Sequence, residues 1–307
     1  MPAGCHPAAP GRTRSALNPP RRRVQFPMNP ARIGYVRYLN TWPLVEGLGK
    51  LGLLELTAAV PSKIIGMLER DEVDLGLASV VDAARSDLDL VVFPVGMIGC
   101  DGPTFTVRLF SRVPAAEVAR VHADTDSHTS ACLCQVILAR TGAGVPALVD
   151  FDARERYAVS GGADDGQWPQ AMLLIGDKVI TDPPPSDLYP FQLDLGQAWK
   201  DLTGLPFVYA AWMCRADRAE ALWTAADLLD RQRRHNLTRL DWIARQRGPE
   251  HRWPVDEARR YLGEFLKFDL GPREREGAER FLAECAALGL VRSRPLTWAD
   301  AAAAHGE

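Results

Sequence analysis

The sequence lacks the segments and motifs that mark several large classes of protein. Its longest apolar stretches, Leu90–Cys100 and Gly204–Cys214, are about eleven residues long and contain Gly or Pro, whereas a membrane-spanning helix needs about 18 apolar residues or more. The patterns GxGxxG, GxxxxGK[ST], HExxH and GxSxG are also missing. We therefore expect no membrane partner, no nucleotide hydrolysis, no zinc catalysis and no serine nucleophile.

Cysteine pairs and metal-binding histidine patterns are missing as well. The six cysteines form no CxxC pair and mostly lie inside apolar runs, where a free thiol behaves as a small hydrophobic group. The histidines are not spaced as metal ligands. These absences favour a reduced, cytoplasmic protein that needs no metal and no cofactor.

The first 27 residues differ from the rest of the chain in charge. They contain five arginines and no acidic residue, so the formal charge of −3 for the whole chain leaves −8 for residues 28–307. They also lack the apolar stretch of about 7–15 residues that a secretory signal needs. The segment could be a basic arm that touches RNA or an acidic partner. We favour a disordered leader over residues 1–27, or a segment translated upstream of a start at Met28.

The acidic remainder of the chain argues against a nucleic-acid partner. From Arg32 onward, short apolar runs alternate with helical patterns, which predicts a parallel sheet covered on both faces. The expected strands are Arg32–Tyr38, Leu56–Val60, Leu75–Ala78, Leu90–Val95, Thr104–Phe110, Val121–Ala123, Ala147–Phe151, Met172–Ile175 and Pro206–Cys214. The helices expected between them are Trp42–Leu51, Lys63–Arg70 with Ser62 as its cap, Val80–Arg85, Ala116–Arg120, Thr129–Arg140 and Leu193–Leu202.

After Ala216 the pattern becomes entirely helical. The helices expected in this tail are Asp217–His235, Leu240–Arg247, Asp256–Leu266 and Glu274–Leu288. About 300 residues is large for one sheet, so we expect an α/β protein of two lobes with a ligand cleft between them. The chain is predicted to cross between the lobes near Phe110–Val113 and Leu205–Tyr209. Residues 28–112 and 206–307 then form the first lobe, and 113–205 the second; the oligomeric state stays open.

Polar residues at strand ends are the first candidates for a binding site. Tyr38, Asn40 and Thr41 lie between the first strand and the first helix, on the side of an open α/β sheet where ligands usually bind. Asn40 and Thr41 could orient a substrate or cap the helix. Gly102 and Thr106 supply a flexible turn and a hydroxyl group before a later strand.

A second group of candidates stands at the start of one expected helix. A helix N-terminus offers free amides and the positive end of a dipole, which attract a carboxylate or a phosphate. Capping by Asp126 or Ser127 would explain part of the pattern, but three hydroxyl residues in four positions exceed what a cap needs, so we expect an anion site. Its residues are Ser127, His128, Thr129 and Ser130.

A carboxylate follows another strand, at Ile175-Gly176-Asp177. The glycine permits close approach of another segment of the chain. Asp177 could act as a base, position another group or cap a helix. Asp164 and Asp165, in a glycine-rich loop, are expected to be solvated.

Taken in order, these motifs carry a family resemblance over roughly residues 32–290. They are Arg32-Ile33-Gly34, Tyr38-Leu39-Asn40-Thr41, Pro43-Leu44, Leu109-Phe110-Ser111, the run Asp126–Leu133, Leu173-Leu174-Ile175-Gly176-Asp177, Asp194-Leu195-Gly196, Trp199, and Thr203-Gly204-Leu205-Pro206-Phe207-Val208 with Ala210 and Trp212. The pattern resembles the chorismate dehydratases of menaquinone biosynthesis, in the futalosine route.

The resemblance implies a two-lobed fold like that of type II periplasmic binding proteins. It also implies removal of water from chorismate to give 3-[(1-carboxyvinyl)oxy]benzoate. Two alternatives stay open: the related 1,4-dihydroxy-6-naphthoate synthase of the same pathway, and a protein that binds a small carboxylate without converting it. A secreted solute-binding protein does not fit the missing apolar signal segment.

Three residues depart from the family pattern. Arg37 stands where a small polar residue or Asn is usual, His128 replaces an Arg, and Thr106 stands where Ser is common. Arg37 could take over the carboxylate pairing lost at position 128, or the substrate could differ.

The chemistry of chorismate suggests roles for these residues. Its two carboxylates must be neutralised without a metal, and the reaction removes the ring C3 proton and the C4 hydroxyl as the ring becomes aromatic. As the base we consider Asp177, or the substrate's own enolpyruvyl carboxylate held by Asn40, and we favour the second. The residues expected to bind substrate are Arg37, Tyr38, Thr41, Ser79, Gly102, Thr106, Ser127, His128, Thr129 and Ser130.

Overall fold

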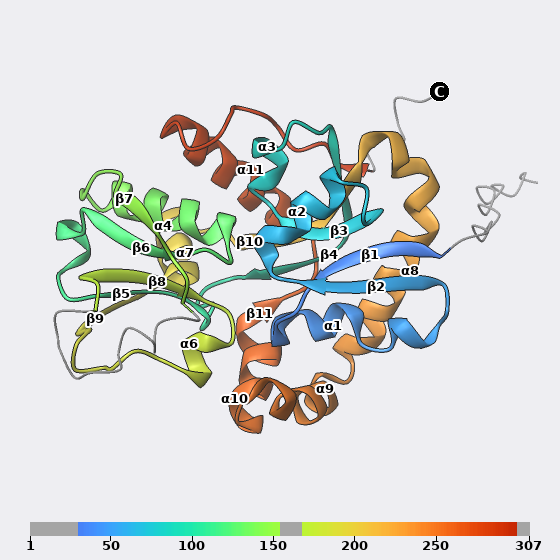
Figure 1. The fold of residues 1–307 in the computed structure, drawn as a ribbon, viewed down its shortest axis with the longest axis horizontal. Coiled ribbons are helices and arrows are strands. Elements are labelled where there is room, and N and C mark those ends of the chain that lie inside the picture. Colours follow the sequence, from blue (N-terminus) through green and yellow to red (C-terminus); the bar gives the residue numbers. More distant parts are fainter. Residues whose placement is uncertain (1–29, 154–167, 300–307) are drawn as a thin grey trace, which may run out of the picture.

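The structure, a computed structural model, describes residues 30–153 and 168–299. The expected leader at residues 1–27, Asp164 and Asp165 lie outside these ranges. Within them the strands form two sheets, one of six strands and one of five, and Figure 1 shows the two sheets side by side, each with its own helices. In the same ranges no helix is both long enough and apolar enough to cross a membrane.

The six-stranded sheet contains the first strands of the chain and two that come much later. Its order is β11-β4-β10-β3-β1-β2. β1 runs parallel to β2 and β3, whereas β10 runs antiparallel to β3 and β4. The strands are β1 (Ala31–Val36), β2 (Leu54–Ala59), β3 (Leu75–Ser79), β4 (Leu90–Cys100), β10 (Phe207–Arg215) and β11 (Leu266–Lys267).

The five-stranded sheet has the order β7-β6-β8-β5-β9. Its strands are β5 (Val107–Ser111), β6 (Arg120–Asp124), β7 (Ala147–Phe151), β8 (Ala171–Ile175) and β9 (Phe191–Asp194). β5 pairs with β8 and β9, whereas the boundary predicted at Phe110–Val113 put this strand in the other lobe. The chain therefore passes between the sheets earlier, through residues 101–106, and returns through residues 204–206.

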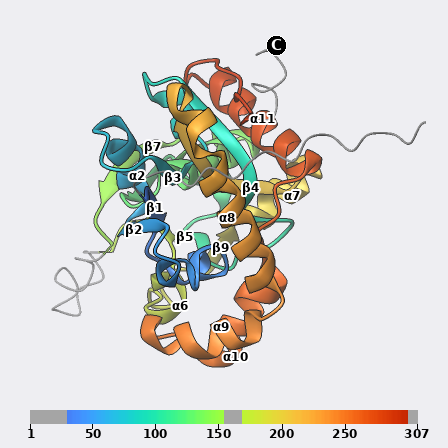
Figure 2. The same cartoon turned by 90° about the vertical axis from the view of Figure 1, so that its right-hand side faces the viewer.

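Helices cover both sheets and make up most of the chain after Ala216, as the sequence pattern predicts. Figure 2 shows α8 running along the six-stranded lobe, with α9 and α10 together at one end of it. The helices of the α/β part are α1 (Trp42–Val45), α2 (Pro61–Glu69), α3 (Asp82–Arg85), α4 (His128–Arg140), α6 (Lys178–Thr181) and α7 (Leu195–Thr203). Those of the tail are α8 (Ala219–Leu237), α9 (Leu240–Arg247), α10 (Val255–Arg260) and α11 (Pro272–Ala287).

Two early helices differ from their predicted bounds for local reasons. The helix predicted over Trp42–Leu51 ends at Val45, because Glu46 (ψ 125°) and Gly47 (φ +88°) leave the helical region, and a 3-10 turn, Leu48–Lys50, follows. The next helix does not use Ser62 as its cap but begins at Pro61. Proline suits the first turn of a helix because its ring fixes φ near the helical value. The N–H that proline lacks would have no acceptor within the helix at this position.

Two elements near the first crossing are also shorter than predicted. The strand predicted from Thr104 begins at Val107, because Phe105 has a φ of +73° and breaks the extended run. The helix predicted over Ala116–Arg120 is a 3-10 turn, Ala115–Glu117, which leads directly into β6.

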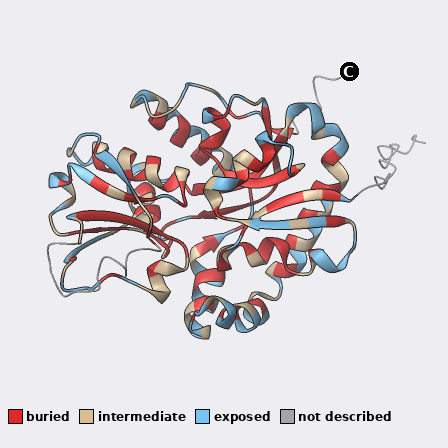
Figure 3. Ribbon diagram, in the orientation of Figure 1, coloured by how far each residue is buried: buried red, intermediate tan, exposed pale blue. Residues whose placement is uncertain are grey.

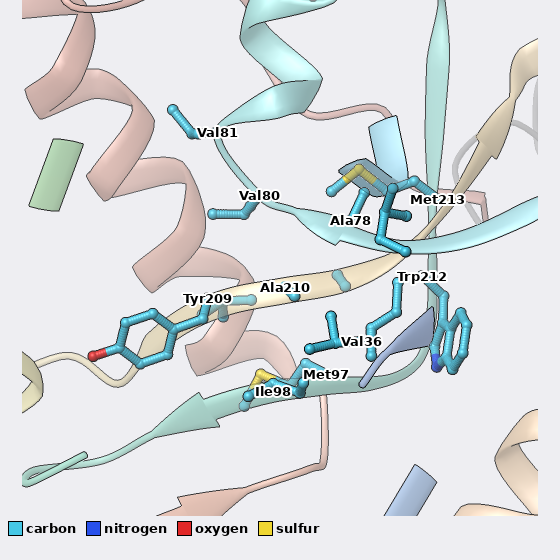
Figure 4. Close-up of a cluster of buried hydrophobic side chains, with 14 of the residues drawn as sticks. Val36, Ala78, Val80, Val81, Met97, Ile98, Tyr209, Ala210, Trp212 and Met213 are labelled. Carbon is cyan, nitrogen blue, oxygen red and sulfur yellow. The ribbon is translucent and has the colours of Figure 1, made fainter. Parts of the chain in front are cut away.

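The core lies along the central strands of each sheet. Figure 3 shows these strands buried while β2 and β7, at the sheet edges, are mostly exposed. Figure 4 shows Val36, Ile98 and Trp212 in one apolar cluster, from which the ring of Tyr209 carries its hydroxyl group away. Burying each large apolar side chain contributes about 1.5–3 kcal/mol, so this cluster gives the site described next a rigid base.

Candidate functional site

A cavity lies between the two sheets, with an empty volume of about 480 Å³ that includes space open to solvent. Its walls come from the ends of β1, β3, β4 and β10 on one side and from β5, β8 and the start of α4 on the other. Among the described residues no charged side chain lines it. Its polar lining residues are Tyr38, Asn40, Ser79, Thr104, Thr106, Ser127, Ser130, Tyr209 and Tyr261.

The start of α4 contributes Ser127 and Ser130 to this wall. Ser127 is the N-cap: its Oγ accepts from the Ser130 amide at 3.1 Å and donates to the Ser130 hydroxyl at 3.0 Å. The cap satisfies one first-turn amide, while the amides of the preceding helical residues have no acceptor within the helix. The helix end can therefore stabilise an anion in the cavity.

Asn40 enters the cavity from a 3-10 turn, Leu39–Thr41. Thr41 is buried, and its Oγ1 donates to Asn40 Oδ1 at 3.2 Å. Thr41 does not line the cavity but orients Asn40. With its Oδ1 engaged, the Asn40 amide group can present its N–H donors to a ligand.

Two buried tyrosines complete the polar lining, and the sequence did not single them out. The Tyr261 hydroxyl lies 2.7 Å from Thr106 Oγ1, and that of Tyr209 lies 2.5 Å from Thr104 Oγ1. Burial raises the pKa of both phenols, so both are neutral hydrogen-bonding groups. Tyr261 begins a π-helical turn, Tyr261–Phe265, a feature common at functional sites, but no local sequence pattern predicts it.

Tyr38 joins the two lobes at the edge of the cavity. Its hydroxyl donates to Asp126 Oδ2 at 2.6 Å, and Lys178 Nζ lies 3.0 Å from the same oxygen. Burial, followed by the charge of Asp126, raises the Tyr38 pKa. The ring packs on Gly176, where φ is +71° and a Cβ would lie 3.1 Å from the ring carbons. The sequence predicted that this glycine permits close approach of backbone, and the group that approaches it is the side-chain ring of Tyr38.

Asp177 does not line this cavity. Its carboxylate lies 3.2–3.3 Å from the amide of Leu39, 3.0 Å from Trp253 Nε1 and 2.8 Å from His251 Nδ1. Its side chain makes no cap bond to α6. Asp177 was considered as a base, as a positioning group and as a helix cap. These contacts favour the role of a positioning group. His251 and Trp253 were not singled out by the sequence.

The other predicted binding residues lie around the cavity but not in its wall. Arg37 is exposed and, with Asp177, borders a neighbouring cavity. His128 Nδ1 lies 2.8 Å from Asp82 Oδ1, an ion pair between the lobes when the imidazole is protonated. Thr129 is buried, and its Oγ1 has no hydrogen-bond partner among the described residues. Gly102, with φ +127°, lies on the crossing between the sheets.

The structure thus brings about half of the predicted binding residues together. Those in the cavity wall are Tyr38, Asn40, Ser79, Thr106, Ser127 and Ser130. Those outside it are Arg37, Thr41, Gly102, His128, Thr129 and Asp177. Sequence spacing placed every one of these residues near a strand end or helix start, but it did not show which side chains turn inward.

Asp194 holds the crossing segment in place. Its carboxylate accepts from the amides of Thr104 at 2.9 Å and Phe105 at 2.7 Å, and from the amide of Gly196 at 3.0 Å as the cap of α7. A Cβ on Gly196 would lie 2.1 Å from Thr104 Oγ1, so a glycine is required there. In the sequence, this role of Asp194 is signalled by an aspartate that stands two residues before a glycine at the start of a helix. Within residues 30–153 and 168–299 no His, Cys, Asp and Glu side chains gather as a metal site.

Comparison with known proteins identifies the family. The menaquinone biosynthesis family matches residues 31–287. The chorismate dehydratase of Thermus thermophilus is 30% identical over 233 residues, which cover 71% of this chain and 81% of that protein.

Solved structures show the fold. The alkanesulfonate-binding protein of Xanthomonas axonopodis matches with a TM-score of 0.57 and 17% identity, covering 88% of this chain and 96% of that one. A Candida albicans protein with the generic periplasmic binding protein fold matches with a TM-score of 0.60 and 11% identity, covering 86% of this chain and 92% of that one. The predicted two-lobed fold of the periplasmic binding protein type is confirmed. From the family match and the sequence identity together, the chain belongs to the chorismate dehydratase family of menaquinone biosynthesis.

Proposed function

We propose that the protein removes water from chorismate to give 3-[(1-carboxyvinyl)oxy]benzoate, a step of menaquinone biosynthesis by the futalosine route. The observation that carries the proposal is the cavity wall, which offers Asn40, several hydroxyl groups and a helix N-terminus but no charged side chain among the described residues. Such a wall can hold a dianion by neutral donors without placing a competing carboxylate beside it.

The two carboxylates of chorismate have separate partners in this arrangement. The start of α4, with Ser127 and Ser130, holds one carboxylate from the five-stranded lobe. Asn40 and the Tyr261 hydroxyl hold the enolpyruvyl carboxylate from the other lobe. Substrate bound in this way touches both lobes and has its reacting ring between them.

The groups that line the cavity do not take up a proton at neutral pH, so the base in this reaction is a group of the substrate itself. Serine, threonine and asparagine do not take a proton at neutral pH, and burial raises the pKa of Tyr38 and Tyr261. Asp177 lies outside the wall with three donors on its carboxylate. The enolpyruvyl carboxylate, oriented by Asn40, therefore takes the ring C3 proton. The C–H electron pair forms the new ring double bond, and the C4 hydroxyl leaves as water with that proton.

We also propose that the protein works in the cytoplasm. Cysteines that are buried and free suit a reducing compartment. They are Cys100, Cys132, Cys134, Cys214 and Cys285.

The test is incubation of the purified protein with chorismate, followed by chromatography of the products. We expect catalytic formation of the benzoate with loss of one water per chorismate. Chorismate that stays unchanged at high protein concentration would contradict the proposal, and tight binding in that case would indicate a carboxylate-binding protein without activity. A matched pair of variants locates the site: Ser79→Ala, in the cavity wall, lowers kcat/KM, whereas Ser111→Ala, a buried strand serine outside it, does not.

A further inference from the structure

The Asp177 carboxylate joins segments that lie far apart in the chain. It follows β8 of the five-stranded lobe, yet its partners are the amide of Leu39, the imidazole of His251 and the indole of Trp253. All three belong to the other lobe or its helical tail. The carboxylate is only 13% exposed and His251 is 17% exposed, so water competes weakly for these hydrogen bonds.

The hydrogen bond on the far side of His251 fixes its tautomer. Trp42 Nε1 lies 2.9 Å from His251 Nε2. An indole N–H can only donate, so Nε2 of His251 is the acceptor. The neutral ring therefore carries its proton on Nδ1 and donates it to Asp177 Oδ2 at 2.8 Å. Trp42, His251 and Asp177 thus form a directed chain of hydrogen bonds.

Asp177, at one end of this chain, connects to the cavity by two routes. Leu39, whose amide Asp177 accepts, begins the turn that carries Asn40. Trp253, the third donor, stacks on Tyr261 with 4.8 Å between ring centroids and 10° between planes. Asp177 therefore contacts the supports of two cavity residues without reaching the cavity itself.

We propose that Asp177 and His251 are positioning residues that hold Asn40 in its productive orientation when the lobes are together. This inference rests on the proposed function, because it assigns their effect to the step in which Asn40 orients the substrate carboxylate. Misplacing such a group by about 1 Å can cost about 100-fold in rate. The effect should fall on kcat and leave KM nearly unchanged.

The directed chain gives a specific test. In Asp177→Asn, the side-chain N–H₂ can replace the oxygen that faces His251, where it meets the Nδ1 proton. If His251 moves its proton to Nε2 to accept from the amide, that proton meets the Trp42 N–H instead. The Trp42→Phe substitution removes the second conflict and lets His251 change tautomer. The second substitution should therefore partly rescue the first.

The experiment is a double-mutant cycle in chorismate turnover. We expect Asp177→Asn to lower kcat by about 10- to 100-fold and Trp42→Phe alone to lower it by about two- to tenfold. The double variant should exceed Asp177→Asn by about threefold or more. Asp182→Asn, which borders the same outer cavity, serves as the matched control and should keep the wild-type kcat.

Independent losses in the two single variants would overturn the inference, and so would an Asp177→Asn variant as active as the wild type. Complete loss in Asp177→Asn without rescue would make Asp177 the base. Nitrogen-15 NMR of the histidines provides a readout apart from activity: the His251 signal should show the Nδ1–H tautomer in the wild type and the Nε2–H tautomer in the double variant. An inactive wild type refutes the proposed function, whereas an active wild type with independent losses refutes only this inference.

Discussion

The cavity wall and the contacts around it are built from the same loops, yet they differ in charge. The wall contains hydroxyl, amide and apolar groups among the described residues. Immediately outside it, charged side chains link the lobes. These links are Tyr38–Asp126, Asp177–His251 and His128–Asp82, and Arg140–Glu284 is a further link at the other end of α4. Under the proposed function, the difference separates two tasks: charge holds the lobes together, and neutral donors meet the substrate.

Electrostatics explains why this separation suits a dianionic substrate. A carboxylate in the wall would repel both substrate carboxylates and compete as a proton acceptor. A lysine or arginine there would pair with the enolpyruvyl carboxylate and weaken it as a base. Neutral donors orient the enolpyruvyl carboxylate with less effect on its basicity, while the start of α4 holds the other carboxylate. The following substitutions compare residues of the cavity wall with the residues that support it.

The largest effect is expected from Asn40→Ala. Removing one donor aimed at a reacting group typically lowers kcat by about 100- to 1,000-fold, and we expect a loss of that order in chorismate turnover. Thr41→Val keeps Asn40 but removes the hydroxyl that donates to its Oδ1, so its loss should be smaller, about tenfold or less. An Asn40→Ala variant that is more active than Thr41→Val would contradict the role of Asn40 in the wall.

Gly176→Ala should damage the contact between Tyr38 and the five-stranded lobe. A left-handed backbone costs a residue with a Cβ about 1–2 kcal/mol, and here the Cβ would also press on the Tyr38 ring. Gly204→Ala is the control, because its φ of +72° is nearly the same and a Cβ there meets nothing within 4 Å. We expect urea unfolding to show a loss of about 2–3 kcal/mol at position 176 and about 1 kcal/mol at 204. Equal losses would show that the Tyr38 contact is unimportant.

Tyr38→Phe tests the link between the cavity wall and its charged surroundings. Its hydroxyl donates to the Asp126 carboxylate, and a hydrogen bond to a charged group contributes about 1.5–3 kcal/mol. Tyr189→Phe is the comparison, because that hydroxyl donates to the neutral Pro169 carbonyl at 2.8 Å, although Arg112 also lies against the ring; a bond to a neutral carbonyl contributes about 0.5–1.5 kcal/mol. The free energy of unfolding should therefore fall more for Tyr38→Phe. The reverse order would argue against a supporting role for the Asp126 link.

The smallest effect is expected at Glu284, which joins α11 to Arg140 of α4. Burial acts to raise its pKa, but hydrogen bonds from Arg140 and Arg280 outweigh burial and hold the pKa below its usual 4.5. A lowered carboxyl pKa stabilises the fold above about pH 4.5, and this contribution is lost as the pH falls through the folded-state value. Glu284→Gln should cost about 1 kcal/mol at pH 7 and progressively less toward pH 3. A loss that does not depend on pH would contradict this assignment.

Local chemistry made part of the site predictable. Ser127 and Ser130 were found because capping and anion binding depend on residues within one helical turn. Gly176 was found because its neighbours in sequence already form a strand end. Asn40 was found from its place after the first strand, although its inward orientation depends on Thr41 and the lobe opposite.

Contacts between distant segments were not predictable in this way. His251 is an isolated histidine in the sequence, and only the fold brings it to Asp177, 74 residues earlier. β5 was predicted as a strand, but its lobe depends on pairing with β8 and β9. Arg37 was predicted to take over a carboxylate pairing, and His128 to bind substrate from the start of a helix. In the structure Arg37 borders the neighbouring cavity and His128 pairs with Asp82.

In the proposed reaction the substrate's own enolpyruvyl carboxylate, held by neutral groups of the wall, takes the proton, so blocking that carboxylate should stop turnover. The most direct measurement is the saturated turnover rate of chorismate methyl-esterified at that carboxylate, with binding measured separately. We expect the ester to bind but to be converted at least about 100-fold more slowly than chorismate, because the ester removes the base. An ester converted at the same saturated rate as chorismate would show that a protein group takes the proton.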